Sequence, residues 1–458
     1  MTPAPASRKE TFLRFASLAI PVFGLFLVLL QWWHITRLRD EIQFAQRTMF
    51  DIWRNHPPAF PPETLANSVY LPAAVSPLAA FDGGDGPWLG QSIWLQLNRI
   101  ARIQDQLGYD LFPSGRQTNL TASLFAQYLI PCLAVFLAWR QASVSRARTL
   151  HSWIMLQTKL IELVGPPLAL CCLLVTLLER QSLGIEGAIR LMLILGVYLL
   201  YSIACGSLAW GIYQSWRSIP RSTAVLVFFW LLNFTLARPL SANLAAAVFP
   251  PPTLDAYVQR LDAEITYGYK GVEPHLDRER RFVAEILREY KAESISEIPM
   301  NFSVLLFKRE EAFQRDVGHR LRAELFSTFE QQERLEQSLS LLFPIIAIQI
   351  SSSALAATDF ASERFQLAQA DQFWARTLDR VYLDLARSSG PNAIRAPRGP
   401  VYWSQIPFFT TAIPPPPYAL NACLIPSALL VFLTAGCLLI VLNRRPNSSQ
   451  EATEETSL

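Results

Sequence analysis

The feature that most constrains this chain is a set of six apolar stretches, each long enough or nearly long enough to cross a lipid bilayer. A membrane-spanning helix needs about 20 predominantly apolar residues. Apolar residues make up 51% of the 458 residues and charged residues only 17%, which is unusual for a soluble protein. We therefore predict an all-α integral membrane protein with six transmembrane helices. The predicted spans are residues 15–33, 120–138, 163–178, 191–210, 223–246 and 419–442.

The positions of basic residues predict the orientation of these spans, because Lys and Arg accumulate in short cytoplasmic loops. We place the N-terminus (1–14), a coupling loop (139–162), a second loop (211–222) and the tail (443–458) in the cytoplasm. Two large, mainly helical extracytoplasmic segments (34–119 and 247–418) and a short outer turn (179–190) follow. Arg37 and Arg39 lie just outside the first span and oppose this orientation. The supporting residues are Arg8, Lys9, Arg14, Arg140, Arg146, Arg148, Arg217, Arg221, Arg444 and Arg445.

One further apolar stretch, residues 339–357, differs from the six spans. It contains Pro344, Gln349 and three consecutive serines at 351–353, which suit lipid poorly. We predict a re-entrant or interfacial helix held against protein. The alternative is a seventh crossing, which would place one end of the chain on the wrong side of the membrane.

Both extracytoplasmic segments have helical patterns. In the second, a helical hairpin is predicted over 253–337, followed by an amphipathic helix over 365–386. Apolar residues recur at every fourth position in the second arm, and such a stripe is expected to pack on a neighbouring helix. In the first segment, the helix of span one continues to Trp53 and a further helix is predicted over 91–107. The stripe consists of Phe313, Val317, Leu321, Leu325 and Phe329.

Motifs for catalysis or cofactor binding are scarce. The chain has no Gly-rich phosphate loop, and its five histidines lack metal-ligand spacing, so we expect neither an enzyme nor a metal site. No nucleic-acid partner is expected. All six cysteines fall in predicted spans, so no disulfide framework is predicted.

Few ionisable residues lie near the membrane, which argues against an ion channel or a proton-coupled carrier. Lys159 and Glu162 could pair on one helix face. Arg190 and Arg238 lie near the outer ends of spans and are interpreted as interface anchors.

Several short segments resemble one bacterial subfamily of ABC-2 type permeases. Residues 298–302, 329–334, 341–347 and 354–360 follow in the order and spacing of that subfamily. Ser76-Pro77-Leu78 with Phe81-Asp82-Gly83 is similar to its first outer segment. Members carry a large domain of unknown function before the last span. The matching positions are Pro299, Asn301, Phe302, Glu330, Gln332, Pro344, Thr358, Asp359 and Phe360.

The resemblance implies the permease subunit of an exporter in the bacterial inner membrane. Such a subunit forms a translocation path with a second permease, as a homo- or heterodimer, and a separate ATPase subunit binds ATP. This chain is then expected to bind no cofactor, to contact membrane lipid and to meet an extracytoplasmic partner. The coupling loop lacks the acidic and glycine residues usual in the family. The expected ATPase-coupling surface comprises Arg140, Arg146, Arg148, Thr149, Lys159, Arg217 and Arg221.

Two other classes compete with this interpretation. One is a membrane-anchored extracytoplasmic interaction protein without transport activity, whose spans only display the outer helices. The other is a membrane enzyme, for which no nucleophile, base or metal constellation is present in the sequence.

Overall fold

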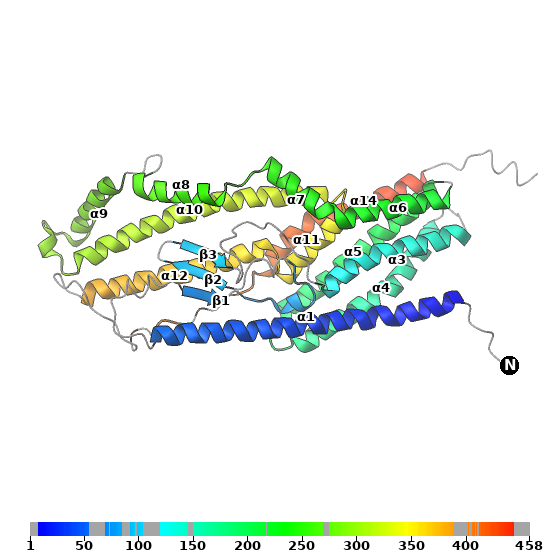
Figure 1. Cartoon of the computed structure of the whole chain (residues 1–458), viewed down its shortest axis with the longest axis horizontal. Coiled ribbons are helices and arrows are strands. Elements are labelled where there is room, and N and C mark those ends of the chain that lie inside the picture. The colour runs from blue at the N-terminus through cyan, green and yellow to red at the C-terminus, as the bar shows by residue number, and fades with distance from the viewer. Residues whose placement is uncertain are drawn as a thin grey trace, which may run out of the picture.

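The computed structural model is predominantly helical (Figure 1). The molecule is elongated. The long apolar helices lie towards one end, and the helices rich in charged residues lie towards the other. The residues that it describes are 8–54, 69–72, 74–84, 92–96, 99–103, 120–144, 150–216, 218–268, 274–388, 402, 405–407, 409 and 412–443.

The apolar end is a bundle of long helices that correspond to the predicted spans. Within the described residues, six helical segments are long and apolar enough to cross a membrane; five of them match predicted spans and the other is Pro344–Arg387. The predicted fifth span corresponds to a bent pair of helices, which would be a seventh candidate if it counts as one span. Their apolar outward faces are typical of contact with lipid. The bundle comprises α1 (Arg8–Arg54), α3 (Ala122–Val144), α4 (Leu150–Leu178), α5 (Gly184–Ser215), α6 (Ile219–Thr235), α7 (Ala237–Val248) and α14 (Pro416–Leu442).

The predicted fifth span is not one straight helix. It is divided into α6 and α7, which meet at Leu236 with a bend of 54°. Pro239 lies in the first turn of α7, where a missing backbone N–H is tolerated. The 17 residues of α6 are only about 25 Å long, so the bend falls near one face of a bilayer.

A long hairpin joins the bundle to the charged end of the molecule. Its arms are α10 (Phe302–Leu339) and α12 (Phe360–Ser388), and its tip is α11 (Pro344–Ala356). The backbone N–H of Asn301 donates to the carbonyl oxygen of Ala386 at 2.9 Å, so the start of α10 lies beside the end of α12.

This hairpin contains residues 339–357, for which the sequence predicts a re-entrant helix. Residues 344–387 are together long and apolar enough for a membrane span. However, the chain enters along α10 and returns along α12 to the same side. The 13 residues of α11 are also only about 20 Å long, too short for a bilayer core of about 30 Å. Helix α11 alone is therefore too short for a crossing, whereas residues 344–387 together are long and apolar enough for one.

The charged end contains α8 (Leu254–Tyr267) and α9 (His275–Tyr290), which lie along α10 (Figure 1). The predicted apolar stripe is confirmed: its last four residues are buried, and Val317 and Leu321 pack with Leu261 of α8. The first arm of the predicted hairpin consists of two helices, followed by a 3-10 turn at Ile295–Glu297.

The helix predicted over 91–107 is wrong, because this region forms strands. Strands β1 (Val69–Pro72), β2 (Ser92–Gln96) and β3 (Arg99–Ile103) pair antiparallel in the order β1-β2-β3. Tyr70 lies opposite Trp94, which lies opposite Ala101. Ile and Trp residues favour the pleated strand conformation and outweigh the helical pattern. The fold is thus predominantly α with one small sheet between α1 and α12 (Figure 1).

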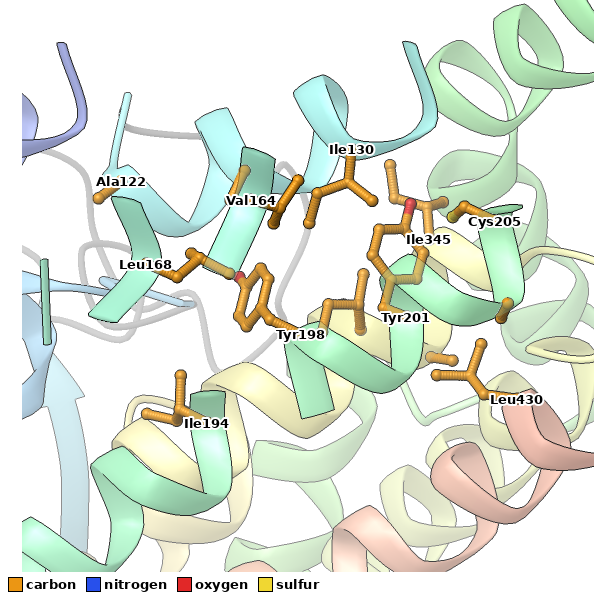
Figure 2. Packing of buried hydrophobic residues seen from close by; sticks show 14 of the residues in the cluster. Ala122, Ile130, Val164, Leu168, Ile194, Tyr198, Tyr201, Cys205, Ile345 and Leu430 are labelled. Carbon is orange, nitrogen blue, oxygen red and sulfur yellow. The ribbon is translucent and has the colours of Figure 1, made fainter. Parts of the chain in front are cut away.

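The main hydrophobic core lies around α5. Figure 2 shows Tyr198 and Tyr201 of α5 among side chains from neighbouring helices. Both tyrosines are completely buried. The labelled neighbours include Ile130 of α3, Val164 and Leu168 of α4, Ile345 of α11 and Leu430 of α14.

Candidate functional site

The short helix α11 is the most enclosed element of the bundle. Every residue from Pro344 to Ala356 is buried except Gln349, which is half-buried. Three consecutive serines at 351–353 present small side chains, which allow close approach of the neighbouring α5 and α14. We call the polar side chains that hold it the α11 seat: Asp82, Gln127, Arg190, Tyr198 and Ser352.

Four members of the α11 seat form one hydrogen-bonded chain. The Ser352 hydroxyl donates to the Asp82 carboxylate and lies 3.3 Å from the Tyr198 hydroxyl oxygen. Gln127 donates from its side-chain nitrogen to the same Tyr198 oxygen at 3.1 Å. All four side chains are buried. Because unpaired polar groups are costly in apolar surroundings, this chain favours one arrangement of α3, α5 and α11.

A tight loop places Asp82 beneath α11. A 3-10 turn at Pro77–Ala80 begins at Ser76, whose hydroxyl accepts from the backbone N–H of Leu78 at 3.2 Å. The Phe81 ring then packs edge-on against Tyr198, with ring centroids 5.7 Å apart. The Asp82 carboxylate accepts from the backbone N–H of Gly84 at 3.0 Å.

Gly84 is required where this loop meets the end of α11. Its φ is +48°, in the left-handed region that favours glycine. A Cβ at this position would lie 2.2 Å from the Thr358 hydroxyl oxygen and 2.8 Å from the Thr358 carbonyl oxygen. No side chain fits without moving the turn that follows α11.

Arg190 contacts the same C-terminal end of α11. Arg190 is 3% exposed, and its guanidinium donates to the carbonyl oxygens of Leu355 at 3.1 Å, Ala354 at 3.4 Å and Pro414. The last carbonyls of a helix lack intrahelical partners and carry partial negative charge, so a cation there is stabilising. The interpretation of Arg190 as an interface anchor is therefore wrong, since α11 and the Pro414 segment cover it.

Three positions that match the permease subfamily, Pro299, Asn301 and Phe302, lie at the end of the hairpin far from α11. The Asn301 side chain caps α10 by accepting from the backbone N–H of Val304 at 3.1 Å. Phe302 packs on the apolar cluster between α10 and α12, whereas Pro299 is exposed. These positions therefore have structural contacts rather than a shared chemical site.

The remaining family-like positions gather near the tip. Pro344 is the first residue of α11, and the Asp359 carboxylate accepts from the backbone N–H of Ser362 at the start of α12. The Thr358 hydroxyl donates to the carbonyl oxygen of Ser353 at 3.3 Å. Together these residues form the turn between the two helices.

An ion pair and an aromatic contact join helices α10 and α12 just beyond this turn. Glu330 pairs with Arg364, and the Phe360 ring lies 5.5 Å from Phe329. Gln332 donates from its side-chain nitrogen to the carbonyl oxygen of Phe249 at 2.6 Å, which fixes the end of α7 on α10.

The expected ATPase-coupling surface is described only in part. Arg140, Lys159 and Arg221 are exposed. Arg146, Arg148, Thr149 and Arg217 lie outside the described residues. Most of the 139–162 region is helical, since α3 continues to Val144 and α4 begins at Leu150.

The suggested pair between Lys159 and Glu162 is not formed. Both side chains are exposed, and no ion pair joins them in the described part of the chain. Each is free to meet solvent or another molecule at the surface of α4.

Two contacts between distant parts of the chain were not predicted. Arg39 pairs with Glu179 of the 179–183 turn at 2.7 Å, which explains an arginine just beyond span one. The Gln366 side chain exchanges two hydrogen bonds of 3.1 Å with the backbone of Ala74, linking α12 to the loop before Asp82. Sequence spacing carries no signal for such contacts.

Charged side chains are buried in the charged end of the molecule. Arg278 is fully buried and makes two bonds to the Glu310 carboxylate, at 2.6 and 3.0 Å. Burial opposes ionisation of Glu310, but the Arg278 hydrogen bonds and charge outweigh it and lower the pKa of Glu310. Burial raises the pKa of neighbouring Glu311 to about 7, although Arg315 opposes this shift.

Metal-ligating and thiol groups do not cluster in the described structure. Among the described residues, no group of three or more His, Cys, Asp or Glu side chains could hold a metal ion. All six cysteines are present as free thiols.

The long apolar helices, their bent fifth pair and the enclosed α11 define a multi-pass membrane protein. Residues 256–412, which extend from α8 past the end of α12, match the family model DUF3526, a domain of unknown function. No curated protein and no solved structure matches the chain.

Proposed function

We propose that this chain is the permease subunit of an ABC-type exporter in the bacterial inner membrane. It forms the translocation path with a second permease and is driven by a separate ATPase subunit that binds ATP. The observation that carries the proposal is the α11 seat. A helix that enters the bundle from the charged end and returns is held there by directional polar bonds.

Helix α11 is suited to act as a gate of the translocation path. Packed elements held by discrete bonds move between distinct arrangements rather than deforming continuously. Helix α11 lies against both α5 and α14, so its displacement would open space between the bundle and the charged end. The Asp82–Ser352–Tyr198 chain and the Arg190 contacts would define the closed arrangement.

The proposed orientation rests on the ends of the helices. The start of α1, the α3–α4 and α5–α6 junctions and the end of α14 lie at the same end of the molecule (Figure 1). We place this end in the cytoplasm because it carries the short basic loops. The hairpin and helices α8 and α9 are then extracytoplasmic, and no catalytic or cofactor site is assigned to this chain.

The ATPase would bind this basic end. Arg140, Lys159 and Arg221 are exposed, and none forms an ion pair within the described structure. Complementary charges on two proteins increase the rate at which they associate and favour the correct partner. These three residues, with Arg146 and Arg148, are therefore the proposed contact.

Affinity purification of the tagged chain from its native membrane tests this proposal. The unaltered chain should recover an ATP-binding cassette ATPase and a second permease. Two variants, R140E/K159E/R221E and R146E/R148E, should each lose the ATPase. The matched control is R280E, because Arg280 is 82% exposed at the opposite end of the molecule.

The outcomes separate the candidate functions. ATPase recovery with the control but not with the basic-end variants supports the permease. Equal recovery with all variants removes these residues from the interface. Recovery of only extracytoplasmic proteins by the unaltered chain would instead favour the anchored interaction protein.

A further inference from the structure

A groove lies along α12, between this helix and residues 402, 405–407 and 409. It has a volume of about 420 Å³, within the range of small-molecule sites. Phe373 and Val381 of α12 form one wall, and Ile406 and Phe409 form the other. The rings of Phe373 and Phe409 lie 5.1 Å apart. The interior of the groove is therefore apolar and aromatic.

The rim of this groove is cationic. Among its twelve lining residues, Arg376 and Arg380 are charged and none is acidic. The two arginines lie one helical turn apart and are both exposed. The Arg380 guanidinium donates to the side-chain oxygen of Gln405 at 3.5 Å, and its carboxylate partner Asp384 lies 4.0 Å away, beyond hydrogen-bonding distance.

Some polar groups at the rim are already used, and others are not. The Gln369 amide is occupied, since it exchanges two hydrogen bonds with the backbone of Ala412. Arg376 makes no hydrogen bond or ion pair with the described residues, and neither does Gln372, one turn before it. Arg376 therefore presents an uncompensated charge beside an apolar hollow.

We propose that this groove binds a single-chain anionic amphiphile, with its carboxylate or similar head on Arg376 and Arg380. The apolar chain would lie along the surface formed by Phe373, Val381, Ile406 and Phe409, because the two rings contact each other and leave no space between them. Charge-assisted bonds to guanidinium groups fix the head, and burial of the chain supplies most of the affinity. The inference goes beyond the proposed transport function, and only the source of the ligand rests on the membrane placement of the hairpin in that proposal.

The position along α12 identifies the source of this ligand. Arg376 lies sixteen residues after Phe360, where α12 leaves the tip of the hairpin, which is about 24 Å along the helix axis. A lipid that stays in the bilayer would not reach so far from the bundle. The ligand must therefore arrive from the aqueous phase.

Photo-crosslinking in nanodiscs of zwitterionic phosphatidylcholine tests the proposal on the full chain. The probe is a lauric acid with a diazirine on its chain, and its methyl ester serves as the neutral probe. Mass spectrometry should map labelling by the acid to residues 369–381 or 405–409. Unlabelled laurate should compete, and the ester should label the groove at least tenfold less.

Substitutions in the groove give the second measurement. R376Q and R380Q should each raise the laurate concentration needed for half-maximal labelling by about tenfold, which corresponds to one charge-assisted bond. The control R387Q removes an exposed arginine from the same helix outside the groove and should leave labelling unchanged. Equal labelling by acid and ester, labelling confined to the bundle, or loss of label when phosphatidylglycerol is added to the disc would overturn the proposal.

Discussion

Replacing Arg190 with methionine should release α11 from the bundle. Methionine keeps much of the side-chain volume but cannot donate to Ala354, Leu355 or Pro414. A hydrogen bond to a charged group contributes about 1.5 to 3 kcal/mol, and orphaned buried carbonyls add to the loss. The 3.4 Å contact is weak, so we expect a total of about 3 kcal/mol. The open population should then rise roughly a hundredfold.

A native cysteine reports this opening. Cys423 of α14 is buried, and its Sγ lies 3.4 Å from the carbonyl oxygen of Ser351 on α11. In a variant that keeps only this cysteine, N-ethylmaleimide should reach it only when α11 moves away. The rate of modification should therefore rise about as much as the open population. The substituted cysteines are Cys132, Cys171, Cys172, Cys205 and Cys437, each changed to alanine.

The control for this experiment is R180M, because Arg180 is exposed in the turn before α5. It should leave the modification rate within about twofold of the parent, as expected of a surface substitution. Thermal unfolding in detergent shows whether each variant is folded before modification is measured. Unchanged Cys423 reactivity in folded R190M would refute the role given to Arg190.

Two further predictions concern stability. Gly84→Ala should destabilise the protein by more than about 2 kcal/mol, because it combines a positive φ with a contact of 2.2 Å between the new Cβ and Thr358. The control Gly184→Ala, at a position with φ +58° and open space, should cost only about 1 kcal/mol. Equal losses of stability in thermal unfolding would contradict the steric argument. Glu311→Gln should flatten the dependence of stability on pH. The folded protein keeps the Glu311 proton up to a pKa of about 7 and the unfolded chain releases it near 4.5, so this group's contribution falls as pH rises between these values. The variant should gain about 1 to 3 kcal/mol relative to the parent at pH 8 and little at pH 4.5, and parallel stability curves would exclude the shift.

The bundle could be predicted from sequence because every membrane span needs about 20 predominantly apolar residues. Long apolar runs identify α3, α5 and α14, although α5 begins seven residues before and ends five residues after the predicted span. Helix α4 begins earlier than its predicted span because its first half mixes polar and apolar residues. Gln157 in this half is buried and donates to the Ser207 hydroxyl of α5 at 3.2 Å.

The α11 seat could not be predicted in the same way. Asp82 and Ser352 are separated by 270 positions, and neither has unusual neighbours in the sequence. The serines at 351–353 indicated a helix held against protein, but not which residues hold it. The apolar stretch with its three serines therefore identified helix α11. The residues that α11 contacts depend on how the hairpin returns along α12.

Because the hairpin is long, a small rotation at its far end moves its tip by a large distance. The 38 residues of α10 form a rod about 57 Å long, and the bond between Asn301 and Ala386 ties its far end to α12. A tilt of about 5° around that far end displaces the tip by about 5 Å, close to one turn of a helix. A small rotation at the charged end is thus sufficient to shift α11 by one helical turn against α5.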